Sequence, residues 1–422
     1  MTGSSPTPSP TPSPPAPSTP TPTRPATLRD RVRGASVEEV VAAVEAWVAD
    51  HVPEPWRQAA AEGRPLREVR SFADYEAWYP TFAAAGLVVP TWPEAYGGLD
   101  LPPATARAVE AVLAPYRLGR LNPLGLNLCA PALFAHGTEW QRRRFLPRIV
   151  DNTERWCQLF SEPGAGSDLA SLATRAERDG DEWVVTGQKV WTTWAHVSDL
   201  AVCLARTDPD APKRKGITYF LVDLRAPGVE VRPLRHLTGE VDFNEVFLDG
   251  VRVPDAHRVG APGEGWKVAG ATLSGERQMV SGAGSGGVDR IGGSGADALL
   301  RPGIADPVLR HRIVALWAEE RIRAWTNRRL RGGPFSSLGK VHAGDLNQRI
   351  QLAAVDALGA HALAWEGEGL DRTVKGMLRS RANTIEGGTT EVNKNVVGER
   401  LLGLPREPDP WAGAAWKDVP RS

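Results

Sequence analysis

The chain has 422 residues, of which 41% are hydrophobic, and its 50 Lys and Arg balance 50 Asp and Glu. This length and apolar content suffice for a large core and predict two or three domains. The balanced charge gives no reason to expect nucleic acid or a membrane surface as a partner. The three cysteines are widely separated, which favours reduced thiols over disulfides or a metal site. Because neither a signal peptide nor a membrane-spanning apolar run is recognisable, we expect a cytoplasmic protein.

The first 155 residues differ sharply in composition. Residues 1–27 are almost entirely Pro, Thr and Ser, which predicts a disordered tail. Residues 28–155 show helical spacing of apolar side chains, and we expect one apolar stripe from Val37, Val40, Val41, Val44 and Trp47. The sequence therefore predicts an N-terminal α-helical domain.

The pattern changes at residue 156. Residues 156–262 contain short apolar runs separated by turn-forming clusters, which predicts a middle β-domain of barrel or sandwich type. The runs are Glu182–Val185, Leu200–Ala205, Ile217–Leu224 and Phe243–Leu248. Helical spacing returns in residues 263–409, which predicts a C-terminal helical bundle, and residues 410–422 are expected to form a surface tail. The fold class is α+β with several domains.

Two short strings in the middle domain point to a ligand. Trp156–Asp168 contains a turn rich in glycine and small residues, and Gly187–Thr193 follows it. Such a turn lets backbone N–H groups approach a ligand closely, and a planar ring can stack on Trp191. The alternative is an ordinary β-turn followed by a strand, which explains the glycines but not the whole string.

A third string, Ile385–Asn395, continues to Arg400–Pro405. Together with the order helix, sheet, helix, these strings resemble the acyl-CoA dehydrogenase family over about residues 60–405. The resemblance implies FAD as the cofactor. It also implies an enzyme that dehydrogenates an acyl thioester between its α and β carbons.

The resemblance assigns residues to the flavin. Thr193 would hydrogen-bond flavin N5, which receives the hydride, and Trp191 would lie against the ring. The residues expected to bind FAD are Gln158, Leu159, Phe160, Ser161, Ser167, Trp191, Thr192, Thr193, Thr389 and Glu391.

The catalytic base is the main departure from the family pattern. Many members place a glutamate immediately before the Gly-Thr pair, where this chain has Gly387, and Glu386 stands one residue too early. We expect Glu386 to line the site or to face outward. Isovaleryl-type and long-chain members instead carry the base on the helix that opens the C-terminal domain. That register selects Glu276, beside Arg277, although an isolated Glu-Arg pair is usually solvent-exposed.

The resemblance also implies how the substrate is held. Glu276 would remove the α-proton while the β-hydride leaves to flavin N5. A backbone N–H of the segment containing Gly387 and Gly388 would hold the thioester oxygen as an oxyanion hole. The residues expected to contact substrate are Ser167, Ser274, Arg277, Gly387 and Gly388, and no metal is expected.

Several alternatives stay open. The same scaffold supports an oxidase or a flavin monooxygenase. A family string Arg-x-x-Phe-Gly, which helps a neighbouring subunit hold the flavin diphosphate, is replaced here by residues 295–303. Together with Gly387, this motivates a third possibility, a catalytically incomplete partner subunit of a hetero-oligomer.

The expected partners follow from the same resemblance. The substrate is acyl-CoA or an acyl-carrier thioester, and the electron acceptor is an electron-transfer flavoprotein or a similar protein. We expect a homo-oligomer, dimeric or tetrameric, or a hetero-oligomer with a homologous chain. The basic run 321–331 is interpreted as a solvated helix face, and the glycine run 282–287 as a packing segment, since no βαβ unit surrounds it.

Overall fold

The computed structural model describes residues 26–280, 293, 295–300, 304–330, 335–363 and 371–420, without the side chains of residues 276–280. The predicted tail up to residue 25 and the glycine run 282–287 lie outside the described residues. The chain divides into two compact units, Met1–Val69 with Pro102–Tyr116, and Arg70–Leu101 with Arg117–Ser422.

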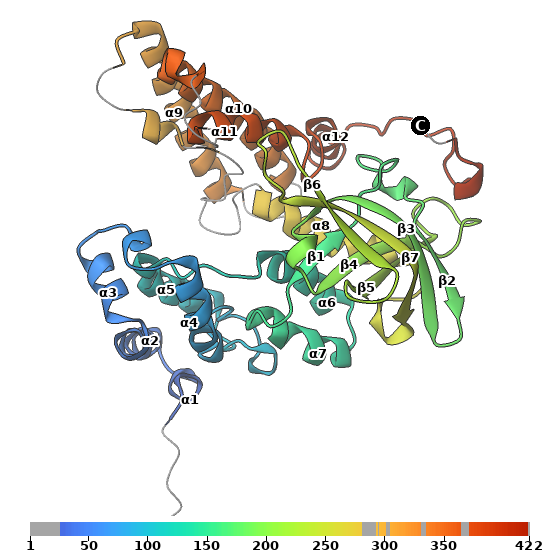
Figure 1. Cartoon of the computed structure of the whole chain (residues 1–422), viewed down its shortest axis with the longest axis horizontal. Helices are drawn as coiled ribbons and strands as arrows, with labels where there is room; N and C mark the ends of the chain where they lie inside the picture. The colour runs from blue at the N-terminus through green and yellow to red at the C-terminus, as the bar shows by residue number, and fades with distance from the viewer. Residues whose placement is uncertain are drawn as a thin grey trace, which may run out of the picture. The chain divides into compact units, whose positions relative to one another are not determined.

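The first unit is helical. It contains α1 (Leu28–Val32), α2 (Val37–His51), α3 (Glu54–Ala61) and α5 (Pro103–Leu113), which Figure 1 labels. Val40, Val44 and Val109 are fully buried and form its core. The predicted stripe was wrong at Val37, which is exposed because it is the first residue of α2, directly after the cap residue Ser36.

The second unit begins with helices that belong to the predicted N-terminal region. They are α4 (Phe72–Ala84), α6 (Ala130–His136) and α7 (Glu139–Val150), and a π-helical segment, η4 (Gly125–Cys129), runs directly into α6. A capping box formed by Thr138 and Gln141 begins α7. π-Helical turns are rare in proteins, and those that occur often lie at functional sites.

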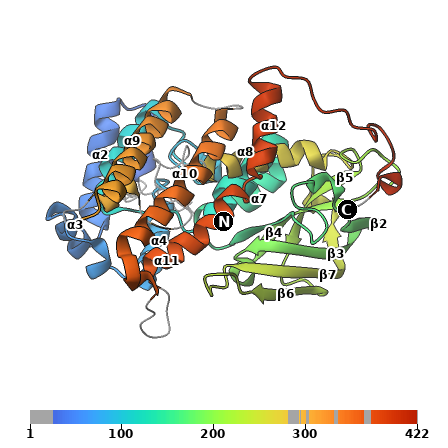
Figure 2. The same ribbon diagram turned by 90° about the horizontal axis from the view of Figure 1, so that it is seen from above.

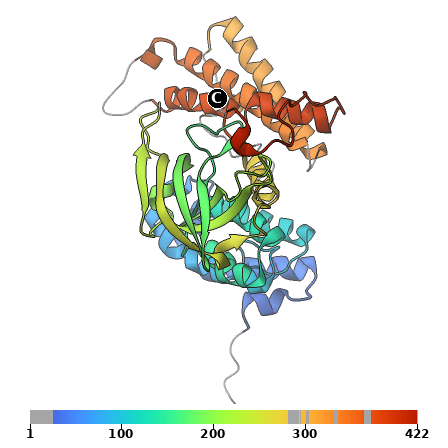
Figure 3. The same ribbon diagram turned by 90° about the vertical axis from the view of Figure 1, so that its right-hand side faces the viewer.

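One eight-stranded sheet forms the middle of the second unit, with the order β6-β7-β3-β2-β4-β5-β8 and β1 paired to β4. Figure 3 shows this sheet in green and yellow-green. Its strands are β1 (Trp156–Leu159), β2 (Arg175–Asp179), β3 (Glu182–Thr193), β4 (Leu200–Arg206), β5 (Ile217–Asp223), β6 (Val229–Leu234), β7 (Phe243–Pro254) and β8 (Arg258–Val259). The predicted β-domain is confirmed. Strand β3 is longer than the predicted run and extends to Thr193.

Successive side chains of β3 point to opposite faces of the sheet, and this determines which of them are buried. Its buried positions are Trp183, Val185, Lys189 and Thr192. The two apolar residues join a core with residues from β1, β4, β5 and β7. The lysine and the threonine are polar residues at interior positions, and such residues require partners.

The C-terminal region is helical, as predicted. It contains α8 (Gly265–Val280), α9 (Pro307–Arg329), α10 (Phe335–Leu358), α11 (Arg372–Ser380) and α12 (Thr390–Arg400). Helix α10 packs against α9, α11 and α12, and Figure 2 shows α9, α10 and α11 side by side. Buried Ile313, Leu316, Leu346 and Ile350 form the core between α9 and α10. In the parts of the chain that the structure describes, no helix is both long and apolar enough to cross a membrane.

The segment after α12 is mostly exposed, and its end is attached to the middle domain. Ala415 forms an antiparallel bridge with Pro212, in the segment between β4 and β5, and Trp416 is 8% exposed. Burial of this large aromatic side chain explains the docking.

Candidate active site

The two strings of the middle domain are joined by a buried ion pair. The Lys189 side chain, which is 0% exposed, places Nζ 2.8 Å from Oε1 of Glu162. The same ammonium donates to the carbonyl oxygens of Phe160 at 3.1 Å and Leu204 at 2.8 Å. All three ammonium protons therefore have acceptors, which a buried lysine needs.

Glu162 closes the glycine-rich loop. Its carboxylate accepts the backbone N–H of Ala173 at 2.6 Å and of Thr174 at 2.9 Å. Burial opposes ionisation, but the charge of Lys189 and these hydrogen bonds outweigh it, and the pKa of Glu162 is lowered. The loop between residues 162 and 173 is thus tied at its base. The sequence analysis did not identify this pair, although a lysine at an interior strand position is the signal that could have found it.

The end of β3 has an unusual backbone. Trp191 and Trp194 adopt φ values of 60° and 55°, in the left-handed region that bulky residues rarely occupy. The pairing of β3 with β7 is irregular between Lys189 and Thr192. The Trp191 side chain is 56% exposed, and its ring meets the edge of Phe243 at 5.8 Å between centroids. Strained backbone of this kind clusters at ligand sites.

The two threonines that follow Trp191 differ in their surroundings. Thr192 is buried, and within the described residues its Oγ1 has no hydrogen-bond partner. Its backbone carbonyl accepts Nδ2 of Asn244 at 3.0 Å. Thr193 is half-buried and pairs with Phe243 in the β3–β7 ladder. The strand therefore points the side chain of Thr192 into the protein and that of Thr193 to the other face.

Among the described residues, no neighbouring atom requires glycine at positions 164 and 166 of the loop. A Cβ built on Gly164 or Gly166 would meet no atom within 4 Å. Both residues are exposed, as is Ser167 between this turn and Asp168. Gln158, Leu159 and Phe160 approach the loop from β1, and Ser161 accepts the backbone N–H of Val190 at 2.9 Å.

Helix α8 is fixed at two places. The Tyr219 hydroxyl of β5 and Thr272 Oγ1 are 2.9 Å apart, and both side chains are buried. At Gly275 the helix touches the backbone of η4 so closely that a Cβ would come within 3.0 Å of the Asn127 carbonyl oxygen. Glu276 is the next residue of α8, and the side chains of Glu276 and Arg277 lie outside the described residues. Ser274 is exposed.

The C-terminal string forms a tight turn before α12. Gly387 and Gly388 have φ values of 66° and 88°, which glycine adopts without strain. The side chain of Asn393 donates to the carbonyls of Gly388 at 2.9 Å and Thr389 at 3.0 Å. The Thr389 hydroxyl caps α12, whose first turn carries the exposed Glu391.

A chain of contacts joins this turn to the end of β3. Glu386 Oε2 lies 3.2 Å from Nη2 of Arg379, and Glu386 Oε1 accepts Nδ2 of Asn383 at 3.0 Å. The Arg379 guanidinium lies over the ring of Phe243 at 5.4 Å, and Phe243 contacts Trp191. The fold therefore brings the strings at residues 187–193 and 385–395 together, and it turns Glu386 toward Arg379.

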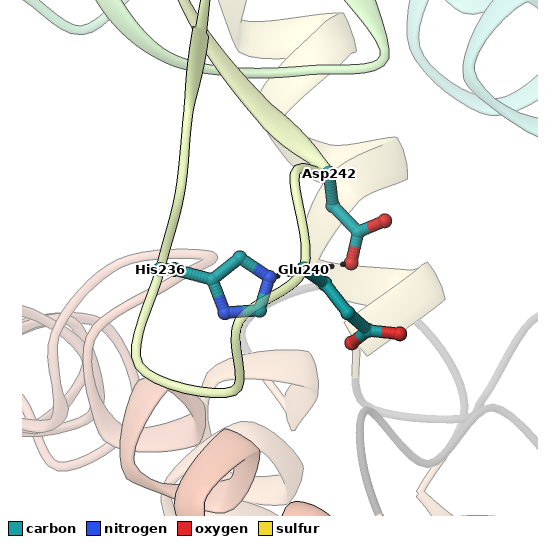
Figure 4. A group of neighbouring side chains, drawn as sticks. All are labelled: His236, Glu240 and Asp242. Atoms are coloured by element: carbon teal, nitrogen blue, oxygen red, sulfur yellow. Dashed lines mark ion pairs between the residues drawn. The ribbon is translucent and has the colours of Figure 1, made fainter. Parts of the chain in front are cut away.

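A second set of polar side chains, after that of Arg379 and Glu386, joins the middle domain to α11 (Figure 4). His236, Glu240 and Asp242 place possible metal-ligand atoms within 4.8 Å of one another. However, Nζ of Lys375 in α11 already forms an ion pair with Glu240. Nε2 of His236 lies 3.5 Å from Oδ2 of Asp242. We interpret this group as an ionic link between the β6–β7 hairpin and α11.

Sequence comparison gives one consistent family. The acyl-CoA dehydrogenase N-terminal domain matches residues 36–153, the middle domain residues 157–251 and the C-terminal domain residues 263–402. The acyl-CoA dehydrogenase IpdE1 of Mycobacterium tuberculosis is 41% identical over 390 residues, covering 88% of this chain and 98% of that protein. The acyl-CoA dehydrogenase FadE34 of the same organism is 42% identical over 332 residues, which is 77% of this chain and 45% of FadE34.

Comparison of folds agrees with the sequence comparison. The crystal structure of the ChsE4-ChsE5 complex from Mycobacterium tuberculosis is 26% identical with a TM-score of 0.65, covering 88% of this chain and 98% of that one. These relatives imply a flavin cofactor. The chain thus belongs to the acyl-CoA dehydrogenase family and is an oxidoreductase that acts on acyl-CoA.

Proposed function

We propose that the protein is an FAD-dependent dehydrogenase that introduces an α,β double bond into an acyl-CoA, with Glu276 as the base. The observation that carries this proposal is the buried ion pair that joins the glycine-rich loop to β3. The Lys189–Glu162 pair holds the loop to the strand that ends in Trp191, Thr192 and Thr193. The chain thereby presents an exposed aromatic face and a loop of small residues on one rigid support.

The residues fit a flavin. A Cβ at Gly164 or Gly166 would meet no atom of the described residues within 4 Å, which favours close approach of a ligand to the backbone as the reason for these glycines. The residues that would hold FAD are Gln158, Leu159, Phe160, Ser161 and Ser167, with Trp191, Thr192, Thr193, Thr389 and Glu391. The Thr389 hydroxyl accepts the Val392 N–H, so its own proton is available for donation. FAD, when bound, supplies the hydride acceptor of the reaction.

Three positions are candidates for the catalytic base: Gly387, Glu386 and Glu276. Gly387 has no side chain, and the carboxylate of Glu386 is already bonded by Arg379 and Asn383. Glu276 follows directly after the point where α8 is fixed against η4, so its backbone is held in one place. A carboxylate enclosed by substrate would have a raised pKa, which suits proton abstraction near neutral pH. Ser274, Arg277 and the turn at Gly387 and Gly388 would bind the thioester, the turn through a backbone N–H.

We propose a bulky, ring-bearing acyl group as the substrate. Two observations on relatives support this class. A structure described as a steroid acyl-CoA dehydrogenase, Tcur3481-Tcur3483, is 26% identical with a TM-score of 0.65. A cyclohexane-1-carbonyl-CoA dehydrogenase of Geobacter metallireducens is 27% identical over 340 residues.

The decisive experiment is anaerobic bleaching of the bound flavin by a panel of acyl-CoAs, including ring-bearing ones. We expect at least one thioester to reduce the wild-type flavin, and Glu276→Gln to retain flavin while losing reduction. Glu386→Gln is the matched control and should keep most of the rate. Equal reduction by wild type and Glu276→Gln would eliminate Glu276 as the base. Peroxide release without an added acceptor would favour an oxidase.

A second candidate function is a subunit of a hetero-oligomer whose homologous partner completes the site. Gly387 in place of the family glutamate supports it, as does the likeness to a structure described as a ChsE4-ChsE5 complex. Co-expression with a homologous chain followed by a count of flavin per polypeptide tests it. Less than one flavin per chain, together with stable co-purification, would support this assembly. An electron-transfer flavoprotein is the acceptor we propose in either case.

A further inference from the structure

We propose that Trp416, in the segment that follows α12, is a positioning residue for the loop that we assign to the flavin. This inference rests on the proposed function. The match to the C-terminal family domain ends at residue 402, so Trp416 lies outside the three matched domains. The side chains of Glu162, Arg206 and Trp416 hold the backbone of residues 170–174.

Five consecutive residues at the C-terminal end of the loop, residues 170–174, are bonded by three side chains. Arg206 donates to the carbonyl oxygen of Ala170 at 2.7 Å and to that of Leu172 at 3.1 Å. Nε1 of Trp416 donates to the carbonyl between them, that of Ser171, at 3.4 Å. The Glu162 carboxylate accepts the next two backbone N–H groups, at residues 173 and 174. The backbone of this stretch therefore depends on one side chain from the start of the loop, Glu162, and on two from more distant parts of the chain, Arg206 and Trp416.

Trp416 also supports Arg206. The Arg206 side chain is buried, and its guanidinium carbon lies 4.2 Å from the centre of the Trp416 ring. A buried guanidinium over an indole face is stabilised by the cation–π interaction, which is stronger away from water. Trp416 thus acts on residues 170–172 twice, directly through Nε1 and indirectly by covering Arg206.

The tail is seated by further contacts. The backbone N–H of Trp416 donates to the carbonyl of Ala211 at 3.0 Å, and that of Lys417 donates to the carbonyl of Pro209 at 3.1 Å. The Lys417 ammonium forms an ion pair with Asp210. These contacts attach the tail to the turn between β4 and β5, independently of the indole. A substitution of Trp416 therefore tests the indole while leaving other anchors of the tail in place.

The contacts of Trp416 affect the glycine-rich loop through Ser171. Asp168, at its end, accepts the hydroxyl of Ser171 at 2.6 Å, so the stretch held by Trp416 continues directly into the loop that carries Ser167. The Lys189–Glu162 pair holds residue 162 and, through the Glu162 carboxylate, residues 173 and 174, whereas Arg206 and Trp416 hold residues 170–172. A loop ordered before it binds loses less entropy on binding, so loosening residues 170–172 weakens the affinity for FAD.

The experiment compares full-length Trp416→Ala and Trp416→Phe with Trp411→Ala. Trp411 belongs to the same tail but is 46% exposed, so it is a matched control. Hydrogen exchange is measured on the flavin-free proteins, and FAD affinity is measured by fluorescence titration. For Trp416→Ala we expect about tenfold faster exchange in residues 168–174 and about fivefold weaker FAD binding. Trp411→Ala should change neither, and Trp416→Phe, which keeps a ring over Arg206, should fall between.

Each outcome has a defined meaning. Unchanged exchange in residues 168–174 of Trp416→Ala would overturn the proposal, and so would faster exchange that leaves FAD affinity unaltered. If Trp416→Ala fails to fold, Trp416→Phe decides, because it removes only the Nε1 donor and part of the ring. A wild type that takes up no FAD would refute the proposed function and the flavin part of this inference. The exchange data would still show whether Trp416 holds residues 170–172.

Discussion

Gly275 of α8 lies against the carbonyl oxygen of Asn127, the middle residue of the π-helical segment. A side chain at position 275 would separate the two backbones, because a Cβ there would approach that oxygen within 3.0 Å. The contact fixes the helix turn that contains residue 276. Substitution by alanine should therefore have opposite effects on stability at Gly275 and at Gly270, a second glycine of α8 with no atom close to its Cβ position.

Gly275→Ala is expected to lower the free energy of unfolding by about 1–3 kcal/mol, the usual cost of overpacking. It should also reduce the rate of flavin reduction at least about tenfold, since small displacements of a catalytic group are costly. Gly270→Ala is the control, because a Cβ there meets nothing within 4 Å and the site is exposed. That variant should be more stable by about 0.5–1 kcal/mol. Equal effects of the two substitutions, measured by urea unfolding and rapid mixing, would contradict the role of the Gly275 contact.

Glu162→Gln leaves the ammonium of Lys189 buried without its carboxylate. We expect a loss of about 3–5 kcal/mol in the free energy of unfolding at pH 7. Because the pKa of Glu162 is lowered in the folded protein, its contribution is complete above the unfolded value of about 4.3 and is lost as the pH falls toward the folded value. The difference between wild type and variant should therefore shrink below about pH 4.3. Urea unfolding at several pH values measures it.

Glu177→Gln is the matched surface control for this experiment. Its ion pair with Arg175 is exposed on both sides, so its loss should change stability by less than about 1 kcal/mol. A Glu162→Gln variant as stable as this control at pH 7 would show that the buried pair does not hold the loop.

Thr192→Val and Thr193→Val separate packing from chemistry. Thr192 Oγ1 is buried without a partner among the described residues, so an apolar replacement of similar shape should be neutral or stabilise by up to about 1 kcal/mol. Thr193→Val should leave stability nearly unchanged but slow flavin reduction about tenfold or more, because it removes the donor we assign to N5. Thermal unfolding and anaerobic reduction give the two readouts. If Thr192→Val slowed flavin reduction and Thr193→Val did not, Thr192 and not Thr193 would be the donor to N5.

The three cysteines should resist alkylation in the native protein. Burial raises the pKa of Cys157 to about 12 and that of Cys203 to about 11, and it raises the pKa of Cys129 as well. Since the thiolate is the reactive form, iodoacetamide at pH 8 should modify none of them before unfolding. Mass spectrometry of native and urea-treated protein checks this. Rapid modification of a native thiol would indicate local opening of that part of the core.

Local patterns in the sequence were sufficient for the order of helical and β regions. Periodicity of apolar residues is a local signal, and it identified the helical regions and the four main strand runs. It was wrong at Val37, where the start of a helix, not its stripe, determined exposure. The family resemblance was confirmed by the three matched domains. The assigned site residues, Glu276 among them, stay predictions.

The sequence by itself thus determined the family and the succession of helical and β regions, and it supplied the strings that we assign to a ligand site. Only the tertiary structure decided which side chains hold that site together. Lys189 and Glu162 are 27 residues apart, and Trp416 is 245 residues from the carbonyl that it binds. Such pairs leave no periodic signal, because hydrogen bonds and ion pairs depend on distance in space. The desolvation of Lys189 and Arg206, which makes their partners necessary, arises only when the sheet and the tail have packed.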